Sequence, residues 1–135
     1  MTIKKNLLRY WESILLIIAI LYLSFAPPST FKEVPTFQIE HLDKIVHVFL
    51  YTLLTVFLIF DFRKAKSSNN FSIHFVLICL LFPVVLGGLV EILQPMYFAP
   101  RTAEWGDWFS DISGMVLGWL IMNFFKTKPK EIECK

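Results

Sequence analysis

Charged residues in this chain stand in short clusters, and the stretches between the clusters are apolar over the length of a membrane span. A transmembrane helix needs about 20 consecutive, mainly apolar residues. Four stretches approach this length, at about 10–26, 43–62, 71–94 and 107–125. The sequence therefore predicts an all-α membrane protein, in which four transmembrane helices form one bundle and a single domain covers 1–135.

The overall composition excludes an ordinary soluble domain. Hydrophobic residues make up 56% of the chain and charged residues 18%, whereas about 25% of a typical soluble domain is charged.

An alternative interpretation makes the first stretch a secretory signal peptide, because basic residues precede it and Ser24-Phe25-Ala26 resembles a cleavage site. We favour a membrane span, since Pro27 would directly follow the cut.

The lysines and arginines predict how the helices are oriented. Ten of the 13 fall in three places: before the first stretch, just after the second, and in the C-terminal tail. Basic segments tend to stay in the cytoplasm, so we expect a multi-pass protein whose two termini and 63–70 connection are cytoplasmic. No nucleic-acid partner is expected, because these clusters lack a base-stacking or groove-reading module.

Glu91 lies inside the third apolar stretch. An ionisable residue in a span is costly, usually faces the bundle interior and marks a functional site. The third helix is expected to run outward, which places Glu91 in its last turn before Pro95, about 6 Å below that end at 1.5 Å per residue. The carboxyl group is therefore expected at the level of the outer leaflet.

Two stripes of polar residues are expected at the same level as Glu91. Residues at three- and four-residue spacing share one face of a helix, and such spacing occurs at the outer ends of the second and fourth stretches. The expected cluster comprises Asp43, Lys44, His47, Tyr51, Glu91, Gln94, Arg101, Glu104, Asp107 and Asp111. Small residues let membrane helices approach closely. This packing role is assigned to Gly87, Gly88, Gly114 and Gly118.

The spacing of these residues resembles a known family. The pattern has three parts, Asp43-Lys44-x-x-His47-x-x-x-Tyr51, Glu91-x-x-Gln94 and Arg101-x-x-Glu104-x-x-Asp107-x-x-x-Asp111-x-x-Gly114-x-x-x-Gly118. It is similar to the VanZ-like family of small bacterial membrane proteins. This resemblance implies a four-helix protein of the bacterial cytoplasmic (inner) membrane, and the founding member is linked to resistance to teicoplanin, a lipoglycopeptide that acts on cell-wall precursors. Asp111 stands where the family often has asparagine, which adds a negative charge.

The first functional hypothesis is a binding site for an envelope lipid, a lipid-linked cell-wall intermediate or a lipoglycopeptide. Lys44 and Arg101 would attract a phosphate or carboxylate, and Arg101 can bind it with two hydrogen bonds. The amide and carboxylates of the cluster would accept hydrogen bonds from sugar or amide groups. Tyr97, Trp105 and Trp108 suit the bilayer interface, where they would hold an apolar ligand body or simply anchor the protein.

Two alternatives stay open. An intramembrane enzyme would use His47 as a general acid or base, oriented by Asp43 one turn earlier. Glu91 would act as its partner, and Arg101 would stabilise a developing anion. A structural network would instead pair Lys44 or Arg101 with Glu91 and fix the helix register. The sequence leaves the oligomeric state open, including a homo-oligomer.

No cofactor is identified by the sequence. A divalent cation held by His47 and the carboxylates is a variant of the enzyme hypothesis. No histidine or cysteine motif with metal-ligand spacing occurs, so we predict no metal site. Cys79 and Cys134 lie at different depths, and no disulfide is expected between them.

Ion pairs are also expected away from the cluster. Glu12 follows Arg9 by three residues, and Lys64 follows Asp61 by three residues. Neighbours at this spacing share a helix face. We therefore interpret both as surface ion pairs.

Overall fold

The structure is a computed structural model that describes residues 10–26, 42–65, 72–97 and 104–125. Within these ranges the chain forms four helices and no strand, which confirms the all-helical prediction. The helices are α2 (Trp11–Phe25), α3 (Leu42–Ala65), a continuous helix made of α4 (Ile73–Phe75), η3 (Val76–Leu81) and α5 (Phe82–Tyr97), and α6 (Trp105–Phe124). The termini of each helix lie within a few residues of the predicted bounds.

The third helix differs from the prediction at its end. It was expected to stop before Pro95, but α5 continues through this proline to Tyr97. Proline lacks an N–H and removes one intrahelical hydrogen bond, the one to the carbonyl four residues earlier. The helix nevertheless continues for two residues beyond Pro95.

A second proline coincides with a wider turn in the same helix. In η3 the Phe82 N–H donates to the Leu77 carbonyl, five residues earlier, and Pro83 follows directly. Such π-helical turns occur where the regular hydrogen-bond pattern is interrupted. The wide turn fits the missing N–H of Pro83, and the helix continues through both segments.

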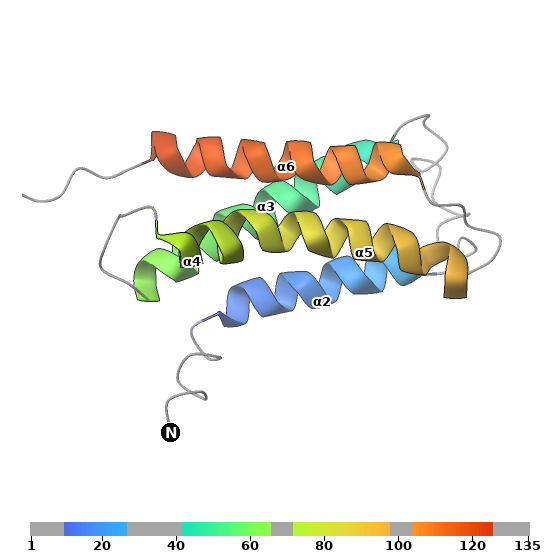
Figure 1. Cartoon of the computed structure of the whole chain (residues 1–135), viewed down its shortest axis with the longest axis horizontal. Coiled ribbons are helices and arrows are strands. Elements are labelled where there is room, and N and C mark those ends of the chain that lie inside the picture. The colour runs from blue at the N-terminus through green and yellow to red at the C-terminus, as the bar shows by residue number, and fades with distance from the viewer. Residues whose placement is uncertain (1–9, 27–41, 66–71, 98–103, 126–135) are drawn as a thin grey trace, which may run out of the picture.

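The four helices run side by side (Figure 1). At the Glu91 end lie the helix termini Phe25, Leu42, Tyr97 and Trp105, and at the Asp61 end lie Trp11, Ala65, Ile73 and Phe124. Each helix therefore runs opposite to the one before it in the chain. The names Glu91 end and Asp61 end are kept below.

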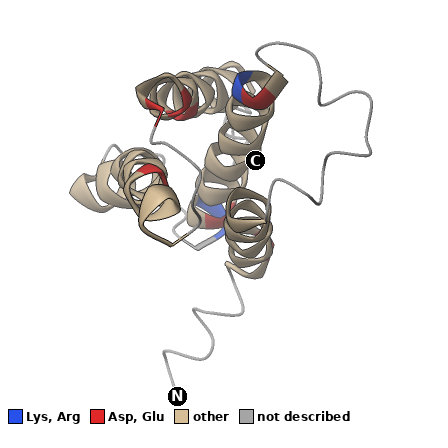
Figure 2. Ribbon diagram, turned by 90° about the vertical axis from the view of Figure 1, so that its right-hand side faces the viewer, with Lys and Arg blue, Asp and Glu red and all other residues tan. Residues whose placement is uncertain are grey.

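Two of the helices are long and apolar enough to cross a membrane, Leu42–Lys64 and Ile73–Tyr97. Only 39% and 28% of their most apolar windows are buried within the structure, whereas the core helix of a soluble protein is mostly buried. Figure 2 shows how little of the helical ribbon is charged, and large apolar side chains such as Phe49 and Ile92 are exposed. These features indicate a membrane protein. The helix α2 is also apolar, with 15 residues.

Glycines set the close contact between α3 and α6. A Cβ at Gly114 would lie 3.0 Å from the Tyr51 Cβ and would clash with the Val48 carbonyl oxygen. At Gly118 it would lie 2.7 Å from the Thr52 carbonyl oxygen. These positions accept hydrogen alone, so the two helices approach backbone to backbone, as small residues allow in membranes.

The other two assigned glycines face α6 from α5. A Cβ at Gly87 would clash with the Asp111 carboxylate, and one at Gly88 would lie 3.2 Å from the Trp108 Nε1. The missing side chain of Gly87 therefore leaves room for a buried carboxylate. All four glycines lie at helix contacts, and they bring α3, α5 and α6 together around the polar residues.

Candidate functional site

Most of the expected cluster residues come together at the Glu91 end. The polar cluster, as described here, comprises Asp43, Lys44, His47 and Tyr51 of α3, Glu91 of α5, Asp107 and Asp111 of α6, and Glu104, which caps α6. Gln94 is buried but turns to α2, where its Nε2 donates to the Ser24 carbonyl oxygen at 3.0 Å. Arg101 lies outside the described residues.

Lys44 is surrounded by carboxylates. Its Nζ lies 3.1 Å from Glu104 Oε2, 3.4 Å from Asp107 Oδ1 and 3.8 Å from Asp43 Oδ2. Asp43 and Glu104 are exposed, so these pairs form the outer layer of the cluster. The described part of the cluster contains five carboxylates and one lysine, so its formal charge is negative. Lys44 is thus already paired, which weakens its predicted role as an attractant for phosphate.

His47 is held by Asp111 across the α3–α6 contact. The Nδ1 of His47 lies 2.8 Å from Asp111 Oδ1, and Asp111 is 1% exposed. An ionised carboxylate only accepts hydrogen bonds, so we assign the proton to Nδ1. The Tyr51 ring stacks on the imidazole with centroids 6.4 Å apart and planes inclined by 8°. The ring of His47 therefore has a fixed orientation.

The predicted orientation of His47 by Asp43 is wrong. Asp43 lies one turn earlier on the same helix, and its Oδ1 accepts from the Lys44 backbone N–H at 2.9 Å. Its carboxylate thus binds the first turn of its own helix, where unpaired N–H groups are available. Asp111 reaches the imidazole instead, because the glycines draw α6 against α3.

Glu91 is buried with one oxygen unpaired. The residue is 4% exposed, and its Oε2 accepts from the Glu104 backbone N–H at 3.1 Å. Its Oε1 has no hydrogen-bond partner among the described residues. Leaving a buried polar group unpaired costs about 1–3 kcal/mol, and such a group in a native structure needs an explanation.

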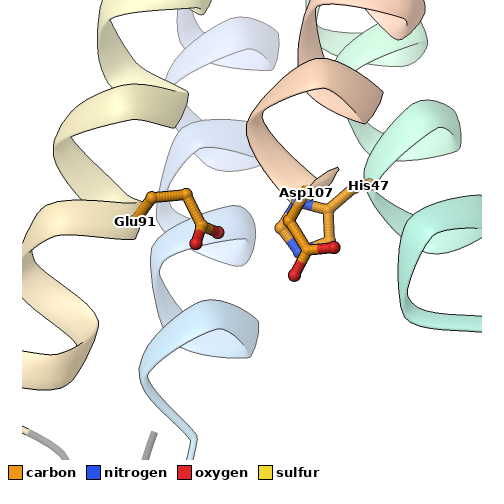
Figure 3. Close-up of side chains that lie close together, drawn as sticks. All are labelled: His47, Glu91 and Asp107. Carbon is orange, nitrogen blue, oxygen red and sulfur yellow. The ribbon is translucent and has the colours of Figure 1, made fainter. Parts of the chain in front are cut away.

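The carboxylate of Glu91 points towards two residues of other helices. Figure 3 shows it directed at His47 and Asp107, which come from α3 and α6. One ligand atom from each of the three residues lies within 4.8 Å of the other two. The Glu91 end therefore holds an imidazole and two carboxylates from three helices around one small volume.

A polar contact at the opposite end was not predicted. Asp61 is 0% exposed, and its Oδ2 accepts from the Ser13 hydroxyl at 2.7 Å. Lys64 lies 4.0 Å from Asp61, as expected, and 3.5 Å from Glu12. The interpretation of Asp61 as a surface residue is wrong, and its position within an apolar stretch was the available signal. Arg9, the expected partner of Glu12, lies outside the described residues.

Trp108 also has a role that the sequence did not indicate. Its indole Nε1 donates to the Val84 carbonyl oxygen at 3.0 Å, between α6 and α5. Trp105 and Tyr97, which were expected at the same interface, are exposed. Trp108 therefore links two helices next to the cluster, in addition to any contact with lipid.

Comparison with known proteins gave no match: no protein-family model, no curated protein and no solved structure matches this chain. The resemblance to the VanZ-like family rests on the spacing of the polar motifs alone. Function is therefore argued from the polar cluster and from the apolar surface that surrounds it.

Proposed function

We propose that this chain is a VanZ-like protein of the bacterial cytoplasmic membrane, with four transmembrane helices and both termini in the cytoplasm. Its polar cluster then binds the headgroup of an envelope lipid or of a lipid-linked cell-wall precursor in the outer leaflet. The two apolar helices and the largely exposed apolar side chains support the membrane placement. The three basic clusters support the orientation.

The observation that carries the proposal is the unpaired Oε1 of the buried Glu91. A polar group in hydrocarbon is retained where it finds a partner, and here the open side faces His47 and Asp107. A ligand that donates hydrogen bonds would supply the missing partner. Because the described cluster is acidic, hydroxyl and amide groups of a sugar or peptide headgroup suit it better than a phosphate bound directly by Lys44.

The proposal is tested in a teicoplanin-sensitive Gram-positive host. Wild type and Glu91→Gln are expressed at equal membrane levels, and drug susceptibility and the binding of labelled teicoplanin to cells are measured. We expect wild type to protect the cells and Glu91→Gln to lose most of this protection. Glu12→Gln, at the Asp61 end, serves as the control and should protect like wild type.

A second measurement addresses the ligand directly. Both proteins are purified with their bound lipids, which are identified by mass spectrometry. A precursor or envelope lipid enriched in wild type and depleted in Glu91→Gln would support the binding site. Equal lipid profiles, together with unchanged susceptibility, would contradict the proposed function.

The pairing of His47 with Asp111 favours a second candidate function, an intramembrane enzyme. A carboxylate-held imidazole is the arrangement of a general base. In the described residues no serine or cysteine joins the cluster beside it, and Cys79 is buried in η3. His47→Ala separates the two functions, because it would abolish turnover in an enzyme but only weaken ligand binding in a receptor.

A further inference from the structure

The polar cluster contains two sets of three potential ligands, and they differ in one respect. The outer set is Asp43, Glu104 and Asp107. The Nζ of Lys44 lies within 4.0 Å of all three carboxylates, so this set already surrounds a cation. The inner set is His47, Glu91 and Asp107, and Lys44 contacts only its last member.

One residue of the inner set has a carboxylate oxygen that still lacks a partner. Glu91 is buried, and Oε1 has no hydrogen-bond partner among the described residues. Figure 3 shows this carboxylate aimed at the imidazole and at Asp107. Histidine nitrogen and carboxylate oxygens are common ligands of zinc and other divalent transition metals.

The hydrogen bond between His47 and Asp111 is of the kind that metal-bound histidines make. Such a histidine almost always donates its other ring N–H to a carboxylate or carbonyl, which fixes the ring and makes the ligand nitrogen more basic. Asp111 accepts from Nδ1 at 2.8 Å. Nε2 is therefore the nitrogen left for a ligand, and the stacked Tyr51 ring helps to hold its direction.

We infer that His47 Nε2, Glu91 and Asp107 form a binding site for a divalent transition metal, with zinc as the first candidate. Bonds of about 2.0–2.2 Å place donor atoms on one ion up to about 4 Å apart. One ligand atom of each residue already lies within 4.8 Å of the other two, so adjustment of the side chains, above all of the flexible glutamate, would bring the donors onto one ion. Access is open, because the His47 and Asp107 side chains are 17% and 13% exposed.

This inference reverses the expectation of no metal site and goes beyond the proposed function. Three protein ligands leave further coordination positions open, as in sites that bind a water or a substrate. A bound dication would also offset the negative charge of the cluster. Where the proposed function holds, it would give a phosphate or carboxylate of the headgroup a cation to bind.

The test uses the full chain, purified in detergent with a tag that contains no histidine and stripped of metal with a chelator. Zinc binding is measured by calorimetry and by metal analysis after desalting. Cobalt absorption spectra report the ligand geometry. We expect one tight site in wild type, and at least about 100-fold weaker binding in His47→Ala or Glu91→Gln.

Two further variants make the test specific. Asp111→Asn removes the carboxylate behind the imidazole but none of the three ligands, and should weaken binding about 10- to 100-fold. His74→Ala removes a histidine in α4, at the Asp61 end, and should bind zinc like wild type. Helical circular dichroism and gel filtration show which variants are folded, and Asp107→Asn replaces any ligand variant that is not.

The inference is overturned if wild type retains no zinc, or if His74→Ala lowers binding as much as His47→Ala. If Arg101 pairs with Glu91, wild type would retain no zinc. Zinc binding is measured without lipid, and lipid enrichment is measured separately. If the protein binds zinc but enriches no lipid, the metal site is supported and the proposed function is contradicted. If it enriches lipid but binds no zinc, the proposed function is supported and the metal site is contradicted.

Discussion

The two ends of the bundle each bury a carboxylate, and within the described part of the chain one oxygen of each carboxylate accepts a hydrogen bond and the other does not. At the Asp61 end, one oxygen of Asp61 accepts from Ser13, and the other has no hydrogen-bond partner among the described residues but lies 4.0 Å from the Lys64 ammonium. At the Glu91 end, one oxygen of Glu91 accepts a backbone N–H and the other has no hydrogen-bond partner among the described residues. Both carboxylates lie in long apolar helices.

This difference shows that a charge in an apolar helix is not by itself a sign of function. Ionisable residues in membrane spans are functional by default only as a starting expectation. Asp61 fits a structural role, because Ser13 donates to one of its oxygens and the Lys64 ammonium lies 4.0 Å from the other. Glu91 fits a binding role, because its open side faces ligand-type groups of two other helices. Four substitutions test this comparison, from the largest expected effect to the smallest.

Gly114→Leu should push α6 away from α3 and have the largest effect. Any side chain here meets the backbone of α3, which cannot move aside as a flexible side chain can. The loss of stability should reach or exceed the 1–3 kcal/mol, roughly, of ordinary overpacking. We expect little protein in the membrane fraction by immunoblot. Gly106→Ala is the control, because its new Cβ would meet only the end of Lys44, and normal accumulation of Gly114→Leu would contradict the close helix contact.

Asp61→Ala should destabilise the protein by about 1–3 kcal/mol, because the buried Ser13 hydroxyl would lose its acceptor. Thermal unfolding in detergent measures this change. Asp61→Asn keeps an acceptor for Ser13 and should cost less. If Asp61→Ala were as stable as wild type, the contact between Asp61 and Ser13 would not help to hold the structure together.

Trp108→Phe should cost about 0.6 kcal/mol, and at most about 1.7 kcal/mol, the range for hydrogen bonds between membrane helices. The ring is kept, but the donation to the Val84 carbonyl is lost. Trp105→Phe is the matched control, since Trp105 is 68% exposed. Equal unfolding temperatures for the two variants would show that the indole N–H does not help to hold α5 against α6.

Glu91→Gln should change the stability of the metal-free protein by no more than about 0.5 kcal/mol. The amide oxygen of glutamine can still accept from the Glu104 N–H, and the oxygen that is replaced has no partner in the described structure. The same unfolding assay checks this. A loss as large as that of Asp61→Ala would make the two ends alike and would favour the structural network over the binding site.

The sequence predicted the helices well because their signal is local. Apolar runs of span length and the helical spacing of polar residues each depend on one segment. The extension of α5 through Pro95 to Tyr97 was missed, since helices usually end at or before the residue that precedes a proline. Membership of the cluster was also largely predictable, because residues of one helix face at one depth tend to meet.

The partners within the cluster were less predictable. Asp43 and His47 share a face of α3, yet the partner of His47 is Asp111, 64 residues later. That choice depends on how closely α6 approaches, which is set by single glycines. Gln94 shows the same limit, because its place on α5 was known but its rotation towards Ser24 was not.

The contact between α3 and α6 also has a consequence for how the protein is made. It joins α3 to α6, about 40 residues further along the chain, so α3 leaves the ribosome well before this partner exists. Until α6 has been synthesised, His47 has no Asp111 and the surface around Val48 has no Gly114 to cover it. The polar cluster therefore cannot assemble before α6 has been made, and a chain that stops short of α6 leaves the imidazole of His47 without its carboxylate partner.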